Sequence, residues 1–279
     1  MSKHVPALKT ADKVKATTIV LQSHRSPLPA SWLESCIASV QQWAKLWNFE
    51  YRFINNELFD FVPKSILEKT QHQIVIATDL GRLKWLQYLL SQGYERAIWV
   101  DADFFIYAPA KFILPTIAES LDKNYEKYFL GREVWIQPNA SKANALKAYI
   151  KVHNAFMVFD QGNSFLDFYT DTAERLLNKN TGAIPPQFIG PKLLTALHNV
   201  IQCSVLESAG MLSPSVIKDI LQGGGAALDL FKAKSKAQAY GLNLCGSMAE
   251  NEAVSNLEME ALIVSLVEQG EQLLACARN

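Results

Sequence analysis

The segment RAIWVDADFFIYAP, from Arg96 to Pro109, constrains the fold of this chain more than any other stretch. It is almost wholly apolar and aromatic, yet it carries two carboxylates, Asp101 and Asp103, one residue apart. A short apolar run is typical of a strand buried on both faces in the centre of a sheet. The run AIWV therefore predicts a central strand that ends at the aspartate pair.

The start of the chain indicates an α/β fold. TTIVLQ (17–22) is a short β-branched run typical of a buried strand, and FEYRFI (49–54) alternates as a strand does. Between them, SWLESCIASVQQWAKLW carries apolar residues at helical spacing, and Ser31 followed by Glu34 predicts a capping box. Strand, helix, strand is the opening of an α/β fold.

The rest of the chain continues this alternation. We expect residues 1–15 to be a loose tail, residues 16–279 to form one domain, and a C-terminal helix to cover about 251–277. A loop-rich stretch is expected at LQGGGAALDLFKAKSKAQAYGLNLCGS. The other expected elements are a helix over 73–90 capped near Gly93, strands at 128–133 and 153–159, helices at NSFLDFYTDTAERLLNK and GPKLLTALHNV, and a short strand at CSVLES.

Composition excludes several classes of protein. Lys plus Arg equals Asp plus Glu at 27 each, so the chain lacks the basic excess of a nucleic-acid binder. Hydrophobic residues make up 49%, which predicts a packed core. No run approaches the roughly 18 apolar residues of a membrane helix, and no secretory signal is evident. We expect a cytoplasmic protein, with peripheral membrane association and oligomeric state left open.

The cysteines do not indicate a metal centre. Cys36, Cys203, Cys245 and Cys276 lie far apart, without a CxxC pair or a histidine at ligand spacing. So few cysteines in so long a chain also argue against a disulfide framework. We expect buried free thiols in a reducing compartment.

The aspartate pair predicts a metal–diphosphate site. Residues i and i+2 of a strand share a face, so Asp101 and Asp103 should point the same way at a carboxyl-terminal strand end, where α/β sheets bind ligands. Two like charges this close raise each other's pKa unless a positive charge lies between them. Mg²⁺ and Mn²⁺ prefer carboxylate, water and phosphate oxygens. The alternative is a polar strand end with two solvated aspartates.

Two other enzyme classes use a similar pattern. Phosphatases of the haloacid-dehalogenase type would use Asp101 as a nucleophile, but they normally carry Thr or Val where this chain has Phe105. Their motif also tends to lie on the first strand. A nucleotidyltransferase would use similar metal chemistry, but no glycine-rich phosphate loop lies near the N-terminus.

The block ATDLGRLKWLQYLLSQGYERAIWVDADFFIY resembles one shared by glycosyltransferases of the GT-A fold. The closest match is the D-x-D sugar-binding group that includes capsular-polysaccharide and α-mannosyl or galactosyl transferases. Weaker matches at HNAFMVF and IGPKLLTAL extend the resemblance over 17–200. The residues that match the block are Thr78, Asp79, Arg82, Gly93, Asp101 and Asp103.

The resemblance implies a fold and an activity. The fold would be α/β, with a mixed, mostly parallel central sheet flanked by helices and a C-terminal helix. The activity would be that of a metal-dependent hexosyltransferase, which moves a sugar from a UDP- or GDP-sugar to a glycan or other acceptor. It also implies retention of anomeric configuration.

The resemblance implies a role for each matching residue near the motif. Asp103 would bind Mn²⁺ or Mg²⁺ directly, and Asp101 would contact the donor ribose or the metal shell. Asp79 and Arg82 would lie at the donor site, with Arg82 near sugar or phosphate oxygens. The alternative for these two is a helical ion pair at positions i and i+3.

More distant residues have two readings each. Gln22 would contact the nucleotide base or be a loop residue. Asn154 would contact sugar or acceptor, or be a buried amide bonded to backbone. Asp160 would face the reacting carbon as a catalytic residue, or begin the turn DQGN.

One departure from the family concerns a late loop. The family often places a histidine there to complete the metal or diphosphate site, whereas QAYGLNLCGS carries Gly241. Asn243 or Ser247 would replace that histidine through water. Otherwise the site is incomplete, and the chain is a sugar-nucleotide-binding protein of the same fold with impaired catalysis.

Overall fold

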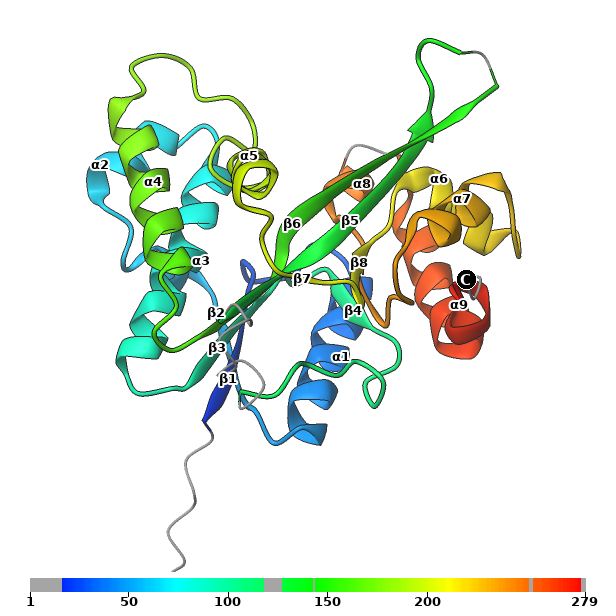
Figure 1. The fold of residues 1–279 in the computed structure, drawn as a ribbon, viewed down its shortest axis with the longest axis horizontal. Coiled ribbons are helices and arrows are strands. Elements are labelled where there is room, and N and C mark those ends of the chain that lie inside the picture. Colours follow the sequence, from blue (N-terminus) through cyan, green and yellow to red (C-terminus); the bar gives the residue numbers. More distant parts are fainter. Residues whose placement is uncertain (1–16, 118–126, 143, 251–252, 277–279) are drawn as a thin grey trace, which may run out of the picture.

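The computed structural model describes residues 17–117, 127–142, 144–250 and 253–276. Two β-sheets form its frame (Figure 1). The larger sheet has six strands, β1 (Thr18–Ser23), β2 (Glu50–Ile54), β3 (Arg96–Val100), β5 (Tyr128–Pro138), β6 (Leu146–Asp160) and β7 (Val205–Leu206). The smaller sheet has three strands, β4 (Phe104–Ile106), β8 (Ala209–Met211) and β9 (Gly241–Asn243).

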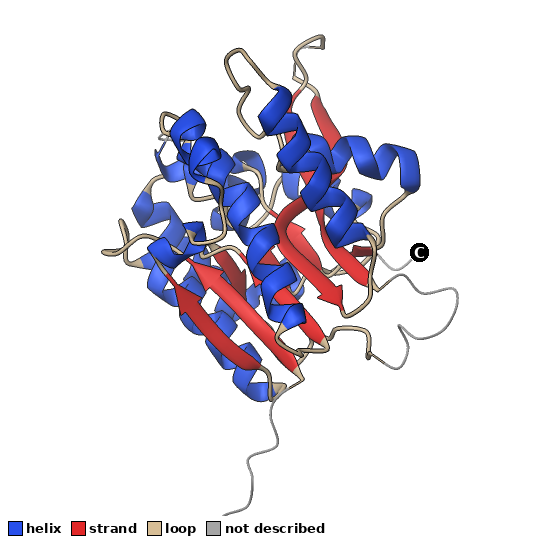
Figure 2. Cartoon of the chain, turned by 90° about the vertical axis from the view of Figure 1, so that its left-hand side faces the viewer, coloured by secondary structure: helices blue, strands red, loops and turns tan. Residues whose placement is uncertain are grey.

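Helices cover both faces of the larger sheet (Figure 2). A single 3₁₀ turn, η1, spans Asn56–Phe59. The α-helices are α1 (Trp32–Leu46), α2 (Lys64–Thr70), α3 (Ile74–Ser91), α4 (Phe165–Lys179), α5 (Pro191–Ile201), α6 (Pro214–Leu221), α7 (Ala226–Lys234), α8 (Ser247–Glu250) and α9 (Asn256–Leu273). The expected α/β fold with a C-terminal helix is confirmed.

The larger sheet is mixed, as expected. Its strand order is β2-β1-β3-β6-β5-β7. β1 pairs in parallel with β2 and β3, and β7 pairs in parallel with β5. β6 runs antiparallel to both β3 and β5. The first strand therefore lies between the second and the third, which makes the β1–β3 edge a topological switch point.

Successive residues of the central strands point to opposite helix layers. Ile19 and Leu21 of β1 pack into the core cluster that contains Leu83 of α3. Val20, between them, packs into the cluster that contains Trp43 of α1. This explains why the central strands are apolar on both faces and why their sequences do not alternate.

A third core cluster lies outside the two layers. It joins the outer part of β5 to the smaller sheet and to α6, α7 and α9. Ser255 and Glu258 form a capping box at the start of α9. The capping box predicted for Ser31 and Glu34 is wrong, because the Ser31 hydroxyl donates instead to Glu260 of α9.

Several expected elements differ in extent. The predicted helix over 73–90 is α3, and Gly93 follows it with φ +90°. The strands predicted at 128–133 and 153–159 are only parts of the much longer β5 and β6. The stretch expected to be loop-rich contains α7 and β9. Residues 1–16 lie outside the described part of the chain, as do the ends predicted for the C-terminal helix.

Within the described ranges, none of the helices has the length and apolarity needed to cross a membrane.

A buried histidine sits at an irregularity in the β5–β6 pairing, between Leu130 and Gly131. A Cβ on Gly131 would lie 2.1 Å from the His153 ring. Nδ1 of His153 accepts from the Ala155 N–H at 3.2 Å, and Nε2 lies 3.2 Å from the carbonyl of Ala209. Burial lowers the pKa of His153 to about 4, so its ring is neutral in the folded protein.

This depressed pKa predicts a loss of stability in acid. Below about pH 6.5, the ordinary pKa of histidine, residue 153 binds a proton in the unfolded chain but not in the folded protein. The contribution of the neutral His153 ring to folding stability is therefore complete above that pH and is lost as pH falls to about 4. The effect should reach about 3 kcal/mol. Urea unfolding across this range should give a shallower acid slope for His153→Gln than for the wild type.

Two buried aspartates have the opposite effect on stability in the same pH range. Burial raises the pKa values of Asp79 and Asp103 to about 6, so these two groups favour the folded state as pH falls from about 6 to about 4. They remain in the His153→Gln variant, so only the difference between the two slopes reports on His153. Identical slopes would contradict the assignment.

Candidate functional site

The Asp101–Asp103 segment joins the two sheets. β3 ends at Val100 and β4 begins at Phe104, and the Phe104 N–H donates to the carbonyl of Asp101 at 3.0 Å. These residues form a turn, so the prediction that strand alternation would orient both carboxylates is wrong. The two side chains nevertheless line one cavity, because the turn lies at the edge where the sheet ends.

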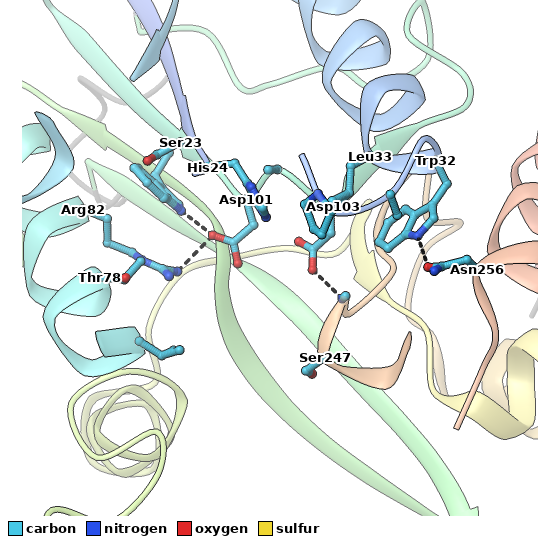
Figure 3. A pocket seen from close by; sticks show the side chains of 16 residues that line it. Ser23, His24, Trp32, Leu33, Thr78, Arg82, Asp101, Asp103, Ser247 and Asn256 are labelled. Atoms are coloured by element: carbon cyan, nitrogen blue, oxygen red, sulfur yellow. Dashed lines mark hydrogen bonds and ion pairs between the residues drawn. The ribbon is translucent and has the colours of Figure 1, made fainter. Parts of the chain in front are cut away.

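This cavity, which we call the first cavity, lies at the carboxyl ends of β1 and β3 and has a volume of about 380 Å³ (Figure 3). Its position is the switch point at which open α/β sheets bind ligands, and its size suits a small molecule. It is lined by Ser23, His24, Pro29, Ala30, Trp32, Leu33, Val75, Thr78, Arg82, Trp99, Asp101, Ala102, Asp103, Gly246, Ser247 and Asn256.

Asp101 is held by three side chains. Its Oδ1 accepts from Arg82 Nη1 at 3.0 Å and from Trp99 Nε1 at 2.6 Å. Gln22 Nε2 donates to the backbone carbonyl of Asp101 at 3.0 Å. The carboxylate is therefore fixed in orientation while it remains partly exposed to the cavity.

Asp103 is held by the late loop. Its Oδ1 accepts from Asn243 Nδ2 at 2.9 Å, and its Oδ2 accepts from the Gly246 N–H at 2.6 Å. Burial, followed by the charge of Asp101, raises the pKa of Asp103 to about 6, while the two hydrogen bonds oppose the rise. Within the described ranges, no Lys, Arg or His forms an ion pair with Asp103.

Arg82 forms ion pairs with Asp101 and Asp79. Its guanidinium lies 3.4 Å from Asp79 Oδ1, donates to the carbonyl of Asn154 at 3.1 Å and lies over the Trp99 ring at 5.0 Å. Asp79 also accepts from Asn154 Nδ2 at 2.8 Å. Arg82 lines the first cavity, and Asp79 lies behind it without lining it. Arg82 therefore forms the helical ion pair with Asp79 and also lines the cavity.

The late loop completes the Asp103 site without a histidine. A Cβ on Gly241 would lie 2.5 Å from Cε1 of Phe104, so no side chain fits at this position in β9. Asn243 contacts Asp103 directly, and Ser247 lines the first cavity. Asn243 therefore supports the Asp103 carboxylate, and the replacement of the family's histidine by Asn243 or Ser247 through water stays a prediction.

The tight packing at Gly241 predicts a stability effect. Gly241→Ala should lower the free energy of unfolding by about 1–3 kcal/mol, because the added methyl group forces the Phe104 ring to move. Gly182→Ala is a matched control, since nothing lies within 4 Å of a Cβ at that position. Urea unfolding of both variants measures the difference. Equal stability of the two would contradict the packing described here.

Two further expected site residues, Gln22 and Asn154, do not line the first cavity. Gln22 is fully buried, and its Oε1 accepts from the Tyr51 hydroxyl at 2.9 Å, so it has no exposed atom for a nucleotide base. Asn154 is a buried amide, as its alternative expected, but its Nδ2 donates to the Asp79 side chain and not to backbone. Both support the cavity from behind and do not line it.

Asp160 lies at the far end of the sheet. Arg96 Nη2 donates to its Oδ2 at 2.8 Å, and the β3–β6 register pairs Arg96 with Asp160 but Val100 with Phe156. Asp160 is therefore next to the amino end of β3, whereas the first cavity is at its carboxyl end. The expectation that Asp160 faces the reacting carbon is wrong, and its alternative role as the start of a turn fits.

Sequence reasoning missed part of the cavity. His24 follows β1 directly, so the rule that ligands sit beyond strand ends could have found it. Trp32 begins α1, and its Nε1 donates to Asn256 Oδ1 of α9 at 2.9 Å. No sequence signal relates Trp32 to Asn256, because these two residues are 224 positions apart.

The residues of the first cavity fit a hard divalent cation bound together with a ligand. Within the described ranges, no group of three or more His, Cys, Asp and Glu could hold a metal ion by itself. Mg²⁺, however, is commonly held by one or two carboxylates, water and substrate phosphates. Formal charges of three aspartates and one arginine leave the cluster of Asp79, Arg82, Asp101 and Asp103 at −2 when all are ionised. The oxygen donors and this charge match such an ion.

No protein-family model matches the chain, and no curated protein matches its sequence. Solved structures do resemble it. A glycosyltransferase involved in the glycosylation of the major capsid of PBCV-1 is 11% identical, with 87% of this chain and 98% of that chain covered and a TM-score of 0.44. The PaToxG glycosyltransferase is 11% identical, with 91% and 87% covered and a TM-score of 0.38.

A third similar structure belongs to another class of enzyme. The 4-diphosphocytidyl-2C-methyl-D-erythritol synthase from Anaerococcus prevotii is 10% identical, with 68% of this chain and 86% of that chain covered and a TM-score of 0.35. All three TM-scores are below 0.5, so these likenesses do not assign a function to the chain.

Proposed function

We propose that the protein is a metal-dependent glycosyltransferase that moves a hexosyl group from a UDP- or GDP-sugar to a glycan or another acceptor. One observation supports this proposal most strongly. Asp101, Asp103 and Arg82 line the same cavity at the carboxyl ends of parallel strands. A diphosphate bound with a divalent cation is the ligand whose charges such a cavity complements.

Different residues of the first cavity would hold different parts of the donor. Pro29, Trp32, Leu33 and Val75 give its lining an apolar component suited to a nucleoside. Asp101 and Asp103 would hold Mn²⁺ or Mg²⁺ against the diphosphate. When bound, the cation supplies Lewis-acid stabilisation of the charge that develops on the leaving diphosphate.

The chain's own residues would orient the donor. Arg82 is fixed by Asp79, Asp101 and the carbonyl of Asn154, so its guanidinium is preorganised where it lines the cavity. Preorganised charges and donors contribute to catalysis because they need no rearrangement during the reaction. Asn243 and Gly246 would likewise fix the carboxylate of Asp103.

Retention of anomeric configuration is part of the proposal. Among the described residues that line the first cavity, Asp101 and Asp103 supply all the carboxylates. Both would be committed to the cation and diphosphate, which leaves no carboxylate in this cavity to act as a base for inversion. Proton NMR of the first-formed product would give its anomeric configuration, and inversion would refute this part.

Incubation with UDP- and GDP-hexoses and Mn²⁺ tests the proposal. We expect slow, metal-dependent release of UDP or GDP even without an added acceptor, because water can replace it. Donor binding without release would instead support the catalytically impaired binding protein. Hydrolysis of simple phosphate esters that is lost in Asp101→Asn would support the phosphatase. Absence of any binding would refute all uses of the cavity for nucleotide sugars.

We also propose a cytoplasmic location. All four cysteines are free thiols, which fits a reducing compartment. Cell fractionation of the expressed protein would test this location and any peripheral association with membranes.

A further inference from the structure

A second cavity of about 630 Å³ lies beside the first and shares Ser247 with it. It is built on the outer half of the long β5–β6 hairpin, which Figure 1 shows as an arm extending from the main sheet. Its lining comes from β5, β6, α5 with the segment before it, β8, Cys245 and the start of α8. The residues are Glu133, Trp135, Gln137, Tyr149, Lys151, Gln187, Pro191, Lys192, Thr195, Met211, Cys245 and Ser247.

Aromatic and polar groups alternate on this cavity's strand floor. Trp135 of β5 is directly opposite Tyr149 of β6, and Glu133 is directly opposite Lys151. The ammonium groups of Lys147 and Lys151 lie over the Tyr149 ring, at 4.7 and 5.8 Å from its centre. The partly exposed Trp135 is therefore the aromatic surface available to a ligand.

Four polar side chains that line this cavity have hydrogen-bonding capacity left for a ligand. Within the described part of the chain, no side-chain hydrogen bond or ion pair engages Glu133, Gln187, Lys192 or Thr195. The Glu133 carboxylate is partly buried, which raises its pKa, while Lys151 lowers it. A carboxylate, an amide, an ammonium and a hydroxyl thus line the same cavity as the Trp135 indole ring.

We propose that this second cavity binds a saccharide, with Trp135 packed against the C–H face of a sugar ring and Glu133, Gln187 and Lys192 bound to its hydroxyl groups. A pyranose presents an apolar face and a polar rim, which is the pattern of this cavity. Its role as the acceptor of the transfer rests on the proposed function.

Two elements connect the second cavity to the first. The Gly246 N–H donates to Asp103, and its neighbours Cys245 and Ser247 line the second cavity. On the other side, Gly190 approaches Asp79 so closely that a Cβ would lie 2.3 Å from Oδ2, and the next residue, Pro191, lines the second cavity. A saccharide here would therefore have one end next to the donor site.

The donor and the acceptor together supply every atom and electron pair that the transfer needs. The acceptor hydroxyl oxygen forms a bond to the anomeric carbon of the donor, and the bond from that carbon to the diphosphate oxygen breaks. The electron pair leaves with the diphosphate, and the hydroxyl proton passes to the released diphosphate. No further reactant is needed.

The test uses the full chain with methyl β-D-galactoside, methyl α-D-mannoside and lactose as probes. We expect saturation-transfer NMR to detect binding of at least one probe by the wild type, and Trp135→Ala to weaken it tenfold or more. Glu133→Gln, which keeps the shape of the side chain, should weaken it less. Trp47→Phe is a control at a partly exposed tryptophan that lines neither cavity, and it should bind as the wild type does.

The outcomes separate this proposal from the proposed function. Saccharide binding lost in Trp135→Ala, without turnover of any nucleotide sugar, would support the saccharide site and refute the transferase. Release of UDP or GDP, with no saccharide binding or with equal binding by Trp135→Ala, would support the transferase and overturn the saccharide site. With both present, Trp135→Ala should lower the ratio of transfer to hydrolysis at least tenfold.

Discussion

Replacing Asp103 with alanine should lower the metal-dependent release of UDP or GDP by about a thousand-fold. The reason is that no ion pair in the described part of the chain engages Asp103: Asn243 and Gly246 donate hydrogen bonds to it, whereas Arg82 pairs with Asp101 and Asp79. Without Asp103 the cavity should not hold a divalent cation against a diphosphate. Calorimetry with UDP should show that Mn²⁺ improves binding in the wild type and has no effect in the variant.

Two variants separate this effect from damage to the fold. Asp103→Asn keeps the size of the side chain and an oxygen that can accept a hydrogen bond, so it should fold normally and still lose the Mn²⁺ effect. Asp229→Ala removes an exposed aspartate from α7 and should leave turnover unchanged. If Asp103→Asn retains both the Mn²⁺ effect and turnover, the metal assignment is wrong.

The sequence predicted the centre of the fold because local patterns and core position agree there. AIWV is apolar on every residue since both faces of β3 are covered by helices, and the aspartates follow it where the sheet ends. The spacing of Asp79 and Arg82 predicted an ion pair on one helix, which the structure contains. These features depend on residues that are near each other in sequence.

The remainder of the site depends on contacts that local patterns do not carry. Asn243 reaches Asp103 across 140 positions, and the reason Gly241 has no side chain is the Phe104 ring opposite it. The outer half of the β5–β6 hairpin was missed although Val134, Trp135 and Ile136 are strong strand formers, and the extent of these strands follows from the pairing of β5 with β6.

The supporting residues behind the cavity explain why the site predictions were only partly successful. Gln22, Asp79 and Asn154 were expected to touch the ligand, but they hold Asp101 and Arg82 in place through buried hydrogen bonds. A sequence pattern identifies the residues of a site together, and it does not distinguish those that line a cavity from those that orient them.

The Arg82→Ala variant should lose about 3–5 kcal/mol of stability, because it leaves the buried carboxylate of Asp79 without its cation. Lys84→Ala is the matched control on the same helix: the Lys84–Glu174 ion pair is about one-quarter exposed, and its loss should cost less than about 1 kcal/mol. Urea unfolding at neutral pH measures both changes.

A double variant then separates the structural role of Arg82 from its role in the cavity. Adding Asp79→Asn to Arg82→Ala removes the unpaired buried charge while keeping an acceptor for Asn154, so about half of the lost stability should return. Binding of UDP with Mn²⁺ should remain impaired, because Asp79 lies behind the cavity and only Arg82 lines it. Recovery of nucleotide binding together with stability would show that Arg82 contributes to the fold alone.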